Sequence, residues 1–247
     1  MKKLFALLLL PSIAFAGKIG ENYVGVELGS TNIDFAYNSS GNDFVASDAN
    51  GFSWSISGNY NIYQPSSEQY GVDLTASYSN GSGDDSAKNT KDDQTWTIDS
   101  EISSFVATIR PHYDFAGFKV FLDLGLLYLD LESVIKNPST TTAAGDSTEF
   151  LYGVGFELDL GDKFSLQPSI NWSETPNLKT TSDTYVGKDT LSFNIPISYT
   201  YSDRLDITAS FSAINNDDFA HSANTSTSFR NVKSESSSWG LGIDYKF

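Results

Sequence analysis

The residues best suited to catalysis lie in two polar stretches. One contains the adjacent pair Asp84-Asp85, and the other is the run Asp217–His221 with Ser222 after it. Histidine titrates near neutral pH and a carboxylate can orient it, so an aspartate with His221 could activate water for hydrolysis. His221 beside Ser222 raises a second possibility, a serine activated by histidine. The chain has no cysteine, which excludes a thiol nucleophile and a thiolate metal site.

A second set of ionisable residues recurs at alternate positions within otherwise apolar stretches. Successive side chains of a β-strand point to opposite faces, so these residues share the face opposite to the apolar side chains. The acids on this face are Glu27, Asp73, Asp123, Glu157, Asp159, Asp206 and Asp244. Lys119 and Lys246 oppose them, and Arg110 is assigned to neither face. Inside a closed fold these acids must be hydrated, paired or protonated.

The alternation is clearest in the last twelve residues, 236–247. Gly240, Gly242, Asp244 and Lys246 occupy one parity, and the other parity is wholly apolar or aromatic: Trp239, Leu241, Ile243, Tyr245 and Phe247. Similar stretches recur along the chain, and together with Thr95–Pro111 they predict ten antiparallel strands. Eight strands is the alternative if one hairpin is misassigned. An even number places both chain ends on one side of a barrel.

The predicted connections alternate between short and long. The short ones are Gln64–Glu68, Asp114–Gly117, Gly161–Lys163 and Ser202–Arg204, and the long polar ones are Asn38–Asn50, Asn80–Asp93, Ile135–Ser147, Ser173–Lys188 and Ala213–Lys233. Tryptophans fall near the long-loop ends of the strands, and other aromatic residues gather near the short turns. Short turns on one rim, long loops on the other and two aromatic levels are typical of a transmembrane barrel.

The first residues and the composition agree with export. Lys2 and Lys3, an apolar run and the ending Ala14-Phe15-Ala16 predict a signal peptide over residues 1–16, cleaved before Gly17. Because Pro11 breaks the run, it is too short for a membrane anchor. Removing the two lysines changes the formal charge from −16 to −18, which argues against nucleic-acid binding. No later apolar stretch approaches the roughly 20 residues of a spanning helix, so any membrane span must be β.

A secreted β-sandwich is the main alternative, because its strands also alternate. Its polar face would meet water and carry more Lys and Glu, whereas this one is rich in Ser, Gly, Asn and Thr. Two features do not fit a regular barrel. Pro196 lies inside a strand and predicts a bulge or local irregularity. The apolar parity also changes along the stretch 95–111, which predicts a bulge near Ser103–Ser104.

With these features the sequence resembles small outer-membrane β-barrel proteins of the OmpA-like or porin-like superfamily. The resemblance covers residues 17–247 as one barrel domain without an added peptidoglycan-binding domain. It implies bacterial outer-membrane localisation, periplasmic termini and contact with outer-membrane lipid and lipopolysaccharide. It also implies that the alternate residues from Trp239 to Phe247 are the signal read by the insertion machinery.

The catalytic candidates depart from the hydrolases of this class. Omptin proteases, which have ten strands, place paired aspartates and an Asp–His couple at the extracellular mouth. Here Asp84 and Asp85 are adjacent, and His221 lies three residues after Asp218 rather than two. No supporting motif accompanies His221 and Ser222, and His112 is predicted to be an ordinary histidine near the periplasmic rim. The sequence therefore predicts no enzyme, no catalytic residue, no cofactor and no metal site.

The leading expectation is a porin-like or structural protein. Its small inward residues would permit a narrow, weakly cation-preferring pore lined by the acids named above. An interior that is hydrated but blocked is the competing interpretation. A second class of function is surface binding or adhesion through the long loops, whose acids could also bind divalent cations weakly. The sequence identifies no extracellular ligand or solute.

Overall fold

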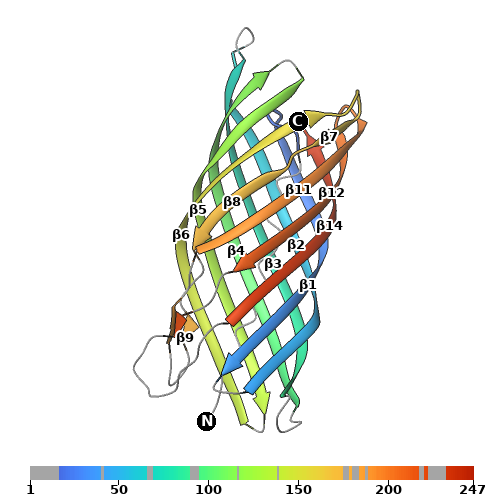
Figure 1. Ribbon diagram of the computed structural model, residues 1–247. Helices are drawn as coiled ribbons and strands as arrows, with labels where there is room; N and C mark the ends of the chain where they lie inside the picture. Colours follow the sequence, from blue (N-terminus) through green and yellow to red (C-terminus); the bar gives the residue numbers. More distant parts are fainter. Residues whose placement is uncertain are drawn as a thin grey trace.

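The computed structural model describes residues 17–39, 42–65, 69–89, 95–115, 117–137, 139–174, 178–179, 184–186, 189–216, 220–221 and 232–247. Over these residues the chain forms an all-β, antiparallel, closed barrel of ten tilted strands (Figure 1). The predicted fold class is confirmed, with ten strands rather than eight. The predicted signal peptide, residues 1–16, lies outside the described residues. In the described chain no helix is long and apolar enough to cross a membrane.

Nine barrel strands are continuous and one is made of two pieces. The continuous strands are β1 (Tyr23–Ser39), β2 (Asn42–Tyr63), β3 (Tyr70–Asn89), β4 (Thr95–Phe115), β5 (Phe118–Asn137), β6 (Ser139–Asp159), β11 (Asp189–Ser202), β12 (Leu205–Asn216) and β14 (Val232–Lys246). The pieces β7 (Phe164–Leu166) and β8 (Ser169–Glu174) both pair with β6 and β11. Short strands β9 (Leu178–Lys179), β10 (Thr184–Val186) and β13 (Ala220–His221) continue the sheet from β6.

The first and last strands close the barrel. β1 pairs with β14 in continuous antiparallel register from Tyr23↔Lys246 to Tyr37↔Val232. Beyond the ladder, the Phe247 amide donates to the Asn22 carbonyl at 3.2 Å. Both ends of the barrel domain therefore lie at one rim. Closure leaves neither β1 nor β14 as a free edge, as a sheet in lipid requires.

The irregularity predicted at Pro196 is confirmed, but it is not a bulge in its own strand. Pro196 pairs with Ser210 on β12 without a register shift. The break falls on its other side, at Gln167 and Pro168 between β7 and β8. There the Gln167 amide donates to the Pro196 carbonyl at 2.9 Å, and the Phe156 amide to the Pro168 carbonyl at 3.1 Å. Because neither proline has an N–H group, the ladder is interrupted where the two lie near each other.

The bulge predicted near Ser103–Ser104 is wrong. The register between β4 and β3 runs without a shift from Tyr70↔Tyr113 to Lys88↔Thr95. Instead, Ile102 and Val106 point inward and are buried, whereas Phe105 points outward. The inward face of β5 is also apolar at this level, at Leu127, Leu129 and Leu131. The change in apolar parity therefore marks an apolar layer inside the barrel.

The short turns are confirmed, but several predicted long loops are strand. Turns join β2 to β3, β4 to β5, β6 to β7 and β11 to β12, and this rim is called the short-turn end below. At the opposite end most of Asn38–Asn50, Asn80–Asp93 and Ile135–Ser147 belongs to strands β1 to β6. These strands extend beyond β8, β11, β12 and β14 (Figure 1). Beyond the apolar band, the polar residues of a strand no longer alternate with apolar residues. The sequence pattern therefore predicts a loop where the chain still forms a strand.

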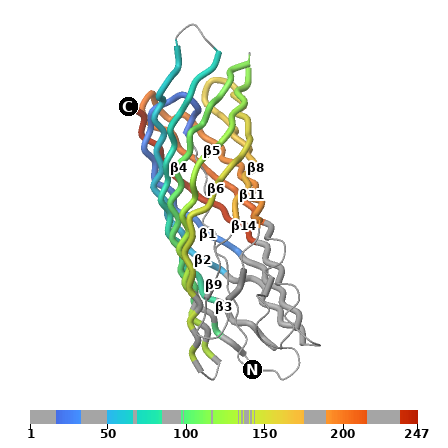
Figure 2. The backbone as a smooth tube through the Cα atoms, turned by 90° about the vertical axis from the view of Figure 1, so that its left-hand side faces the viewer, coloured from blue at the N-terminus to red at the C-terminus, as the bar shows by residue number. Residues whose placement is uncertain are grey.

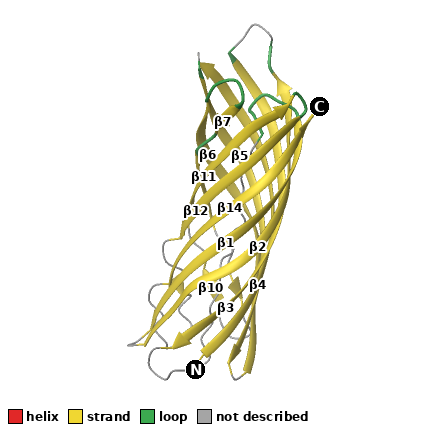
Figure 3. Cartoon of the chain, turned by 90° about the vertical axis from the view of Figure 1, so that its right-hand side faces the viewer, coloured by secondary structure: helices red, strands yellow, loops and turns green. Residues whose placement is uncertain are grey.

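An apolar band surrounds the barrel, whose strands all tilt in one sense (Figure 3). On β5 the exposed apolar side chains run from Phe118 to Tyr128. At about 3.3 Å per residue and a tilt of roughly 40°, this span is about 25 Å tall, the height of a membrane-facing band. Aromatic pairs mark both margins: Trp54 with Tyr78 and Tyr152 with Trp172 at one, and Tyr63 with Tyr70, Phe115 with Phe118 and Phe164 with Tyr199 at the short-turn end.

Candidate functional site: the ionic cluster inside the short-turn end

Charged side chains gather inside the barrel near the short-turn end. The sequence predicts most of them, and the alternation of burial along each strand confirms their inward direction. The inward buried acids are Glu27, Asp73, Asp123, Glu157, Asp206 and Asp244. The predicted inward acid Asp159 is different, because it lies at the rim with 53% of its side chain exposed and pairs with Lys18 at 3.7 Å.

Arg110, which the sequence leaves unassigned, forms a bidentate pair with Asp123. It points inward from β4, and its Nε and Nη2 donate to the two Asp123 carboxylate oxygens at 2.7 and 3.1 Å. The guanidinium also lies over the Phe121 ring, 4.4 Å from its centroid. Both charged side chains are less than 5% exposed. Arg110 shares its parity with the polar residues Ser104, Thr108 and His112, which indicates that it faces inward. The pattern is hard to recognise in the sequence because Ile102 and Val106, on the same parity, are apolar.

A second pair joins neighbouring strands β5 and β6. Lys119 Nζ donates to Glu157 Oε1 at 2.9 Å, and Gln167 Nε2 donates to Glu157 Oε2 at 2.6 Å. The Glu157 side chain is only 1% exposed. Gln167 lies at the break between β7 and β8, where no strand pattern identifies a partner. This carboxylate is therefore held by a cation on one side and an amide on the other.

His112 lies near the short-turn rim, as predicted, because it pairs with Gly71 close to the start of β3. It is not interfacial, however, because its side chain is buried in the interior. Its side chain is 1% exposed, and Nδ1 is 3.7 Å from Asp73 Oδ2. Asp73 also accepts a hydrogen bond from Asn61 Nδ2 at 2.8 Å. The histidine faces inward because β4 has no bulge, which keeps it in register with the other inward residues of the strand.

The third group is dominated by acids. Asp206 on β12 and Asp244 on β14 are directly opposite each other and both are buried. Lys246 Nζ lies 3.0 Å from Asp206 Oδ1, and Glu27 points inward from the adjacent strand β1. Like charges placed directly opposite across two strands repel. This side of the interior therefore carries an excess of negative charge.

Small inward residues make room for these carboxylates. A Cβ atom on Gly25 would overlap Asp244 Oδ1, and one on Gly240 would overlap Glu27 Oε1. The sequence predicts that such small inward residues leave space for a narrow passage. At this end of the barrel the space is occupied by the carboxylates themselves.

The terminal strand has the predicted exposed face. Its outward residues are Trp239, Leu241, Ile243, Tyr245 and Phe247, which are 48–66% exposed. Their outward orientation is confirmed by their exposure. That the insertion machinery recognises these five residues stays a prediction. Contact of the barrel with lipopolysaccharide also stays a prediction.

The catalytic candidates are only partly within the described residues. Asp84 and Asp85 belong to strand β3 rather than a loop, and Asp84 is exposed opposite Asp99. His221 lies on the short strand β13. Residues 217–219 and Ser222 are outside the described residues, and so is most of Ala213–Lys233. The described chain contains no group of three or more His, Cys, Asp or Glu residues arranged to hold a metal ion.

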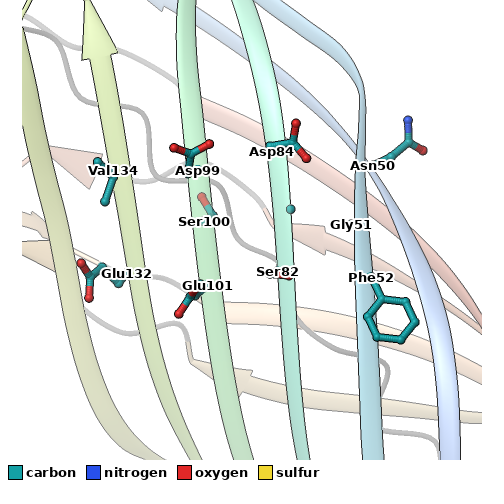
Figure 4. A pocket seen from close by; sticks show the side chains of 11 residues that line it. Asn50, Gly51, Phe52, Ser82, Asp84, Asp99, Ser100, Glu101, Glu132 and Val134 are labelled. Atoms are coloured by element: carbon teal, nitrogen blue, oxygen red, sulfur yellow. The ribbon is translucent and has the colours of Figure 1, made fainter.

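A pocket at the end opposite the short turns has an acidic lining. In Figure 4, Asp84 and Asp99 lie on neighbouring strands, and Glu101 and Glu132 form a second opposed pair. Lys136 Nζ donates to Asp99 Oδ2 at 2.7 Å. These side chains are solvent-exposed, so the pocket carries charge but none of the buried pairing seen at the short-turn end.

Comparison with known proteins agrees with this architecture. The transport unit of the autotransporter AIDA-I from Escherichia coli has a TM-score of 0.60 at 12% identity, covering 97% of this chain and 94% of that one. The outer membrane protease OmpT from Escherichia coli has a TM-score of 0.53 at 10% identity, covering 93% and 98%. At such identities the likeness shows the fold alone. No curated protein matches the sequence significantly. The model of the outer membrane protein beta-barrel domain family matches residues 4–184, so the chain belongs to that family.

Proposed function

We propose that this outer-membrane barrel has no catalytic activity and forms a narrow passage that prefers cations. The observation that supports the proposal is the charge of the inward face near the short-turn end. Six buried carboxylates face the interior there: Glu27, Asp73, Asp123, Glu157, Asp206 and Asp244. The inward cations in the same region are Arg110, Lys119 and Lys246.

The arrangement of these charges favours cations over anions. Arg110 donates to both carboxylate oxygens of Asp123, and Lys119 donates to Glu157. Lys246 pairs with Asp206, which faces Asp244 directly, so the six inward acids outnumber the three inward cations and favour a negative potential. A ring of carboxylates in a narrow pore attracts cations and repels anions. The selectivity should therefore depend most on the acids of β12 and β14.

The direct test is single-channel recording of the refolded protein in a planar bilayer under a potassium chloride gradient. We expect discrete steps and a reversal potential of the sign produced by cation selectivity. Asp244→Asn should shift that potential toward zero, because it removes one of two opposed inward acids. Asp99→Asn is the matched control: Asp99 is exposed at the opposite end and should leave selectivity unchanged. Anion selectivity in the parent protein would refute the proposal.

The absence of catalysis has a separate test. The refolded barrel should turn over neither peptide nor phospholipid substrates. If either were hydrolysed and His221→Ala abolished the turnover while the barrel stayed folded, the protein would be a hydrolase. Binding to a surface that is lost on deletion of residues 213–233 would instead favour the adhesion alternative.

A further inference from the structure

The segment before β1 lies inside the short-turn end. Gly17 is buried against the Tyr23 ring, and a Cβ atom at this position would overlap that ring. Ile19 is only 2% exposed although it belongs to no strand. The start of the described chain, in blue, lies at the same end of the barrel as the C-terminus (Figure 2). Residues 17–22 are called the entry segment below.

Two carboxylates of the ionic cluster hold the backbone of the entry segment. The Ile19 amide donates to Glu157 Oε2 at 2.9 Å, and the Gly20 amide donates to Asp73 Oδ2 at 2.9 Å. These acids come from β6 and β3. The entry segment thus supplies donors to carboxylates that the barrel wall satisfies only in part.

Wall side chains also donate to the entry segment. Lys119 Nζ donates to the Ile19 carbonyl at 2.8 Å, and Gln167 Nε2 donates to the Gly17 carbonyl at 2.8 Å. Asn59 Nδ2 donates to the Glu21 carbonyl at 2.7 Å. Asn59 is on β2 and Gln167 is at the break between β7 and β8, five strands apart around a ten-stranded cylinder. The entry segment therefore connects opposite walls across the lumen.

We propose that the entry segment is an internal plug that closes the short-turn end of the lumen, and that ions pass when it is released. The inference rests on the proposed function and names its regulation. Release breaks no pairing within the strand ladders, because residues 17–22 precede β1; beyond the ladder it breaks the bond from the Phe247 amide to the Asn22 carbonyl. Most of the contacts are hydrogen bonds to charged or amide groups, which water can replace. Release also uncovers Glu157 and Asp73, so the open state has more accessible negative charge than the closed state.

The position of the plug can be tested without measuring conductance. The chain has no cysteine, so Ile19→Cys introduces a unique thiol. In the folded protein in lipid vesicles, we expect this thiol to react at least tenfold more slowly with a hydrophilic maleimide than the thiol of Asp203→Cys. Asp203 is exposed in a turn of the same rim. Equal labelling rates of the two thiols would overturn the plug whatever the conductance.

The gating role is tested by releasing the plug. Ile19→Asp places a carboxylate among Glu157 and Asp73 and should expel the entry segment, raising the mean conductance several-fold. Ile19→Val preserves an apolar side chain and is the matched control. Ile19→Ser is a milder second variant if Ile19→Asp does not refold, and the heat-modifiable mobility of the barrel reports folding in each case.

The outcomes separate the two proposals. A protected Ile19→Cys thiol together with higher conductance in Ile19→Asp supports both. If the thiol is protected but every folded variant stays silent, the segment is a fixed lining and both the gate and the passage are refuted. If the parent protein already conducts as well as Ile19→Asp, the passage stands and the plug is overturned.

Discussion

Replacing Arg110 by alanine should destabilise the barrel more than breaking any exposed ion pair. The substitution leaves the Asp123 carboxylate buried without its two guanidinium hydrogen bonds of 2.7 and 3.1 Å. It also removes the cation from the Phe121 ring. Breaking a buried pair by removing one partner costs about 3–5 kcal/mol. With a urea m-value of about 3 kcal/mol/M, the unfolding midpoint should fall by roughly 1–1.7 M.

The assay is urea unfolding of the refolded protein in lipid vesicles, followed by tryptophan fluorescence and by heat-modifiable mobility. Lys136→Ala is a matched control, because Lys136 and Asp99 lie at the same 2.7 Å but their side chains are 55% and 51% exposed. An exposed pair contributes about 0–1 kcal/mol, so its midpoint should hardly move. The double variant Arg110→Met with Asp123→Asn should recover most of the loss, since it removes both charges of this pair and leaves neither partner unpaired. Equal destabilisation by Arg110→Ala and Lys136→Ala would refute the reasoning.

Three further predictions follow from the rim and the interior. Burial raises the pKa of Glu21, with Lys246 at 3.6 Å opposing the shift. Seating the proposed plug therefore favours the protonated form of Glu21, and the open fraction of channel records should fall on acidification but less so in Glu21→Gln. The other charged groups near Glu21, which this variant retains, are Lys18, Asp206 and Glu157. Gly240→Val forces a side chain against Glu27 and should lower the free energy of unfolding by about 1–3 kcal/mol in the same urea assay. Phe247→Ala should slow assembly by purified insertion machinery but leave the stability of the assembled barrel unchanged, because Phe247 is exposed on the outer face; unchanged assembly kinetics would contradict this prediction.

The alternation of side chains predicts the membrane-facing part of the fold well. From Val24 to Leu28 and from Trp239 to Phe247, one parity is apolar because it faces lipid and the other is small or charged because it faces the interior. The short turns are equally visible, since they interrupt the alternation abruptly. These features arise from local geometry, which a single sequence records directly.

The sequence is less informative where both faces of a strand meet similar surroundings. On β4 and β5 the inward residues Ile102 and Leu129 are as apolar as the outward ones, so polarity alone cannot separate the faces. Beyond the band both faces of β3 are polar, so the sequence pattern predicts a loop at Asp84. In each case the missing information is which strand lies opposite, and that is set by register over long sequence separations.

The interior partners depend even more strongly on closure. Nothing near Gln167 in the sequence indicates that it donates to Gly17, which is 150 residues away. Similarly, the inward direction of Glu157 is predictable, whereas its hydrogen bond from the Ile19 amide is not. Parity assigns a side chain to a face, but only the closed cylinder brings particular wall positions together with the entry segment.

The width of the barrel gives a physical reason for the entry segment. Side chains just fill the interior of a barrel of about eight strands, and a ten-stranded barrel is wider. Carboxylates on distant strands, such as Asp73 on β3 and Glu157 on β6, are therefore poorly placed to share one cation of the wall. A peptide crossing the lumen supplies N–H groups in the middle, where wall side chains are scarce. The amides of Ile19 and Gly20 donate to these two acids, so the same contacts that satisfy the acids would also obstruct the proposed passage.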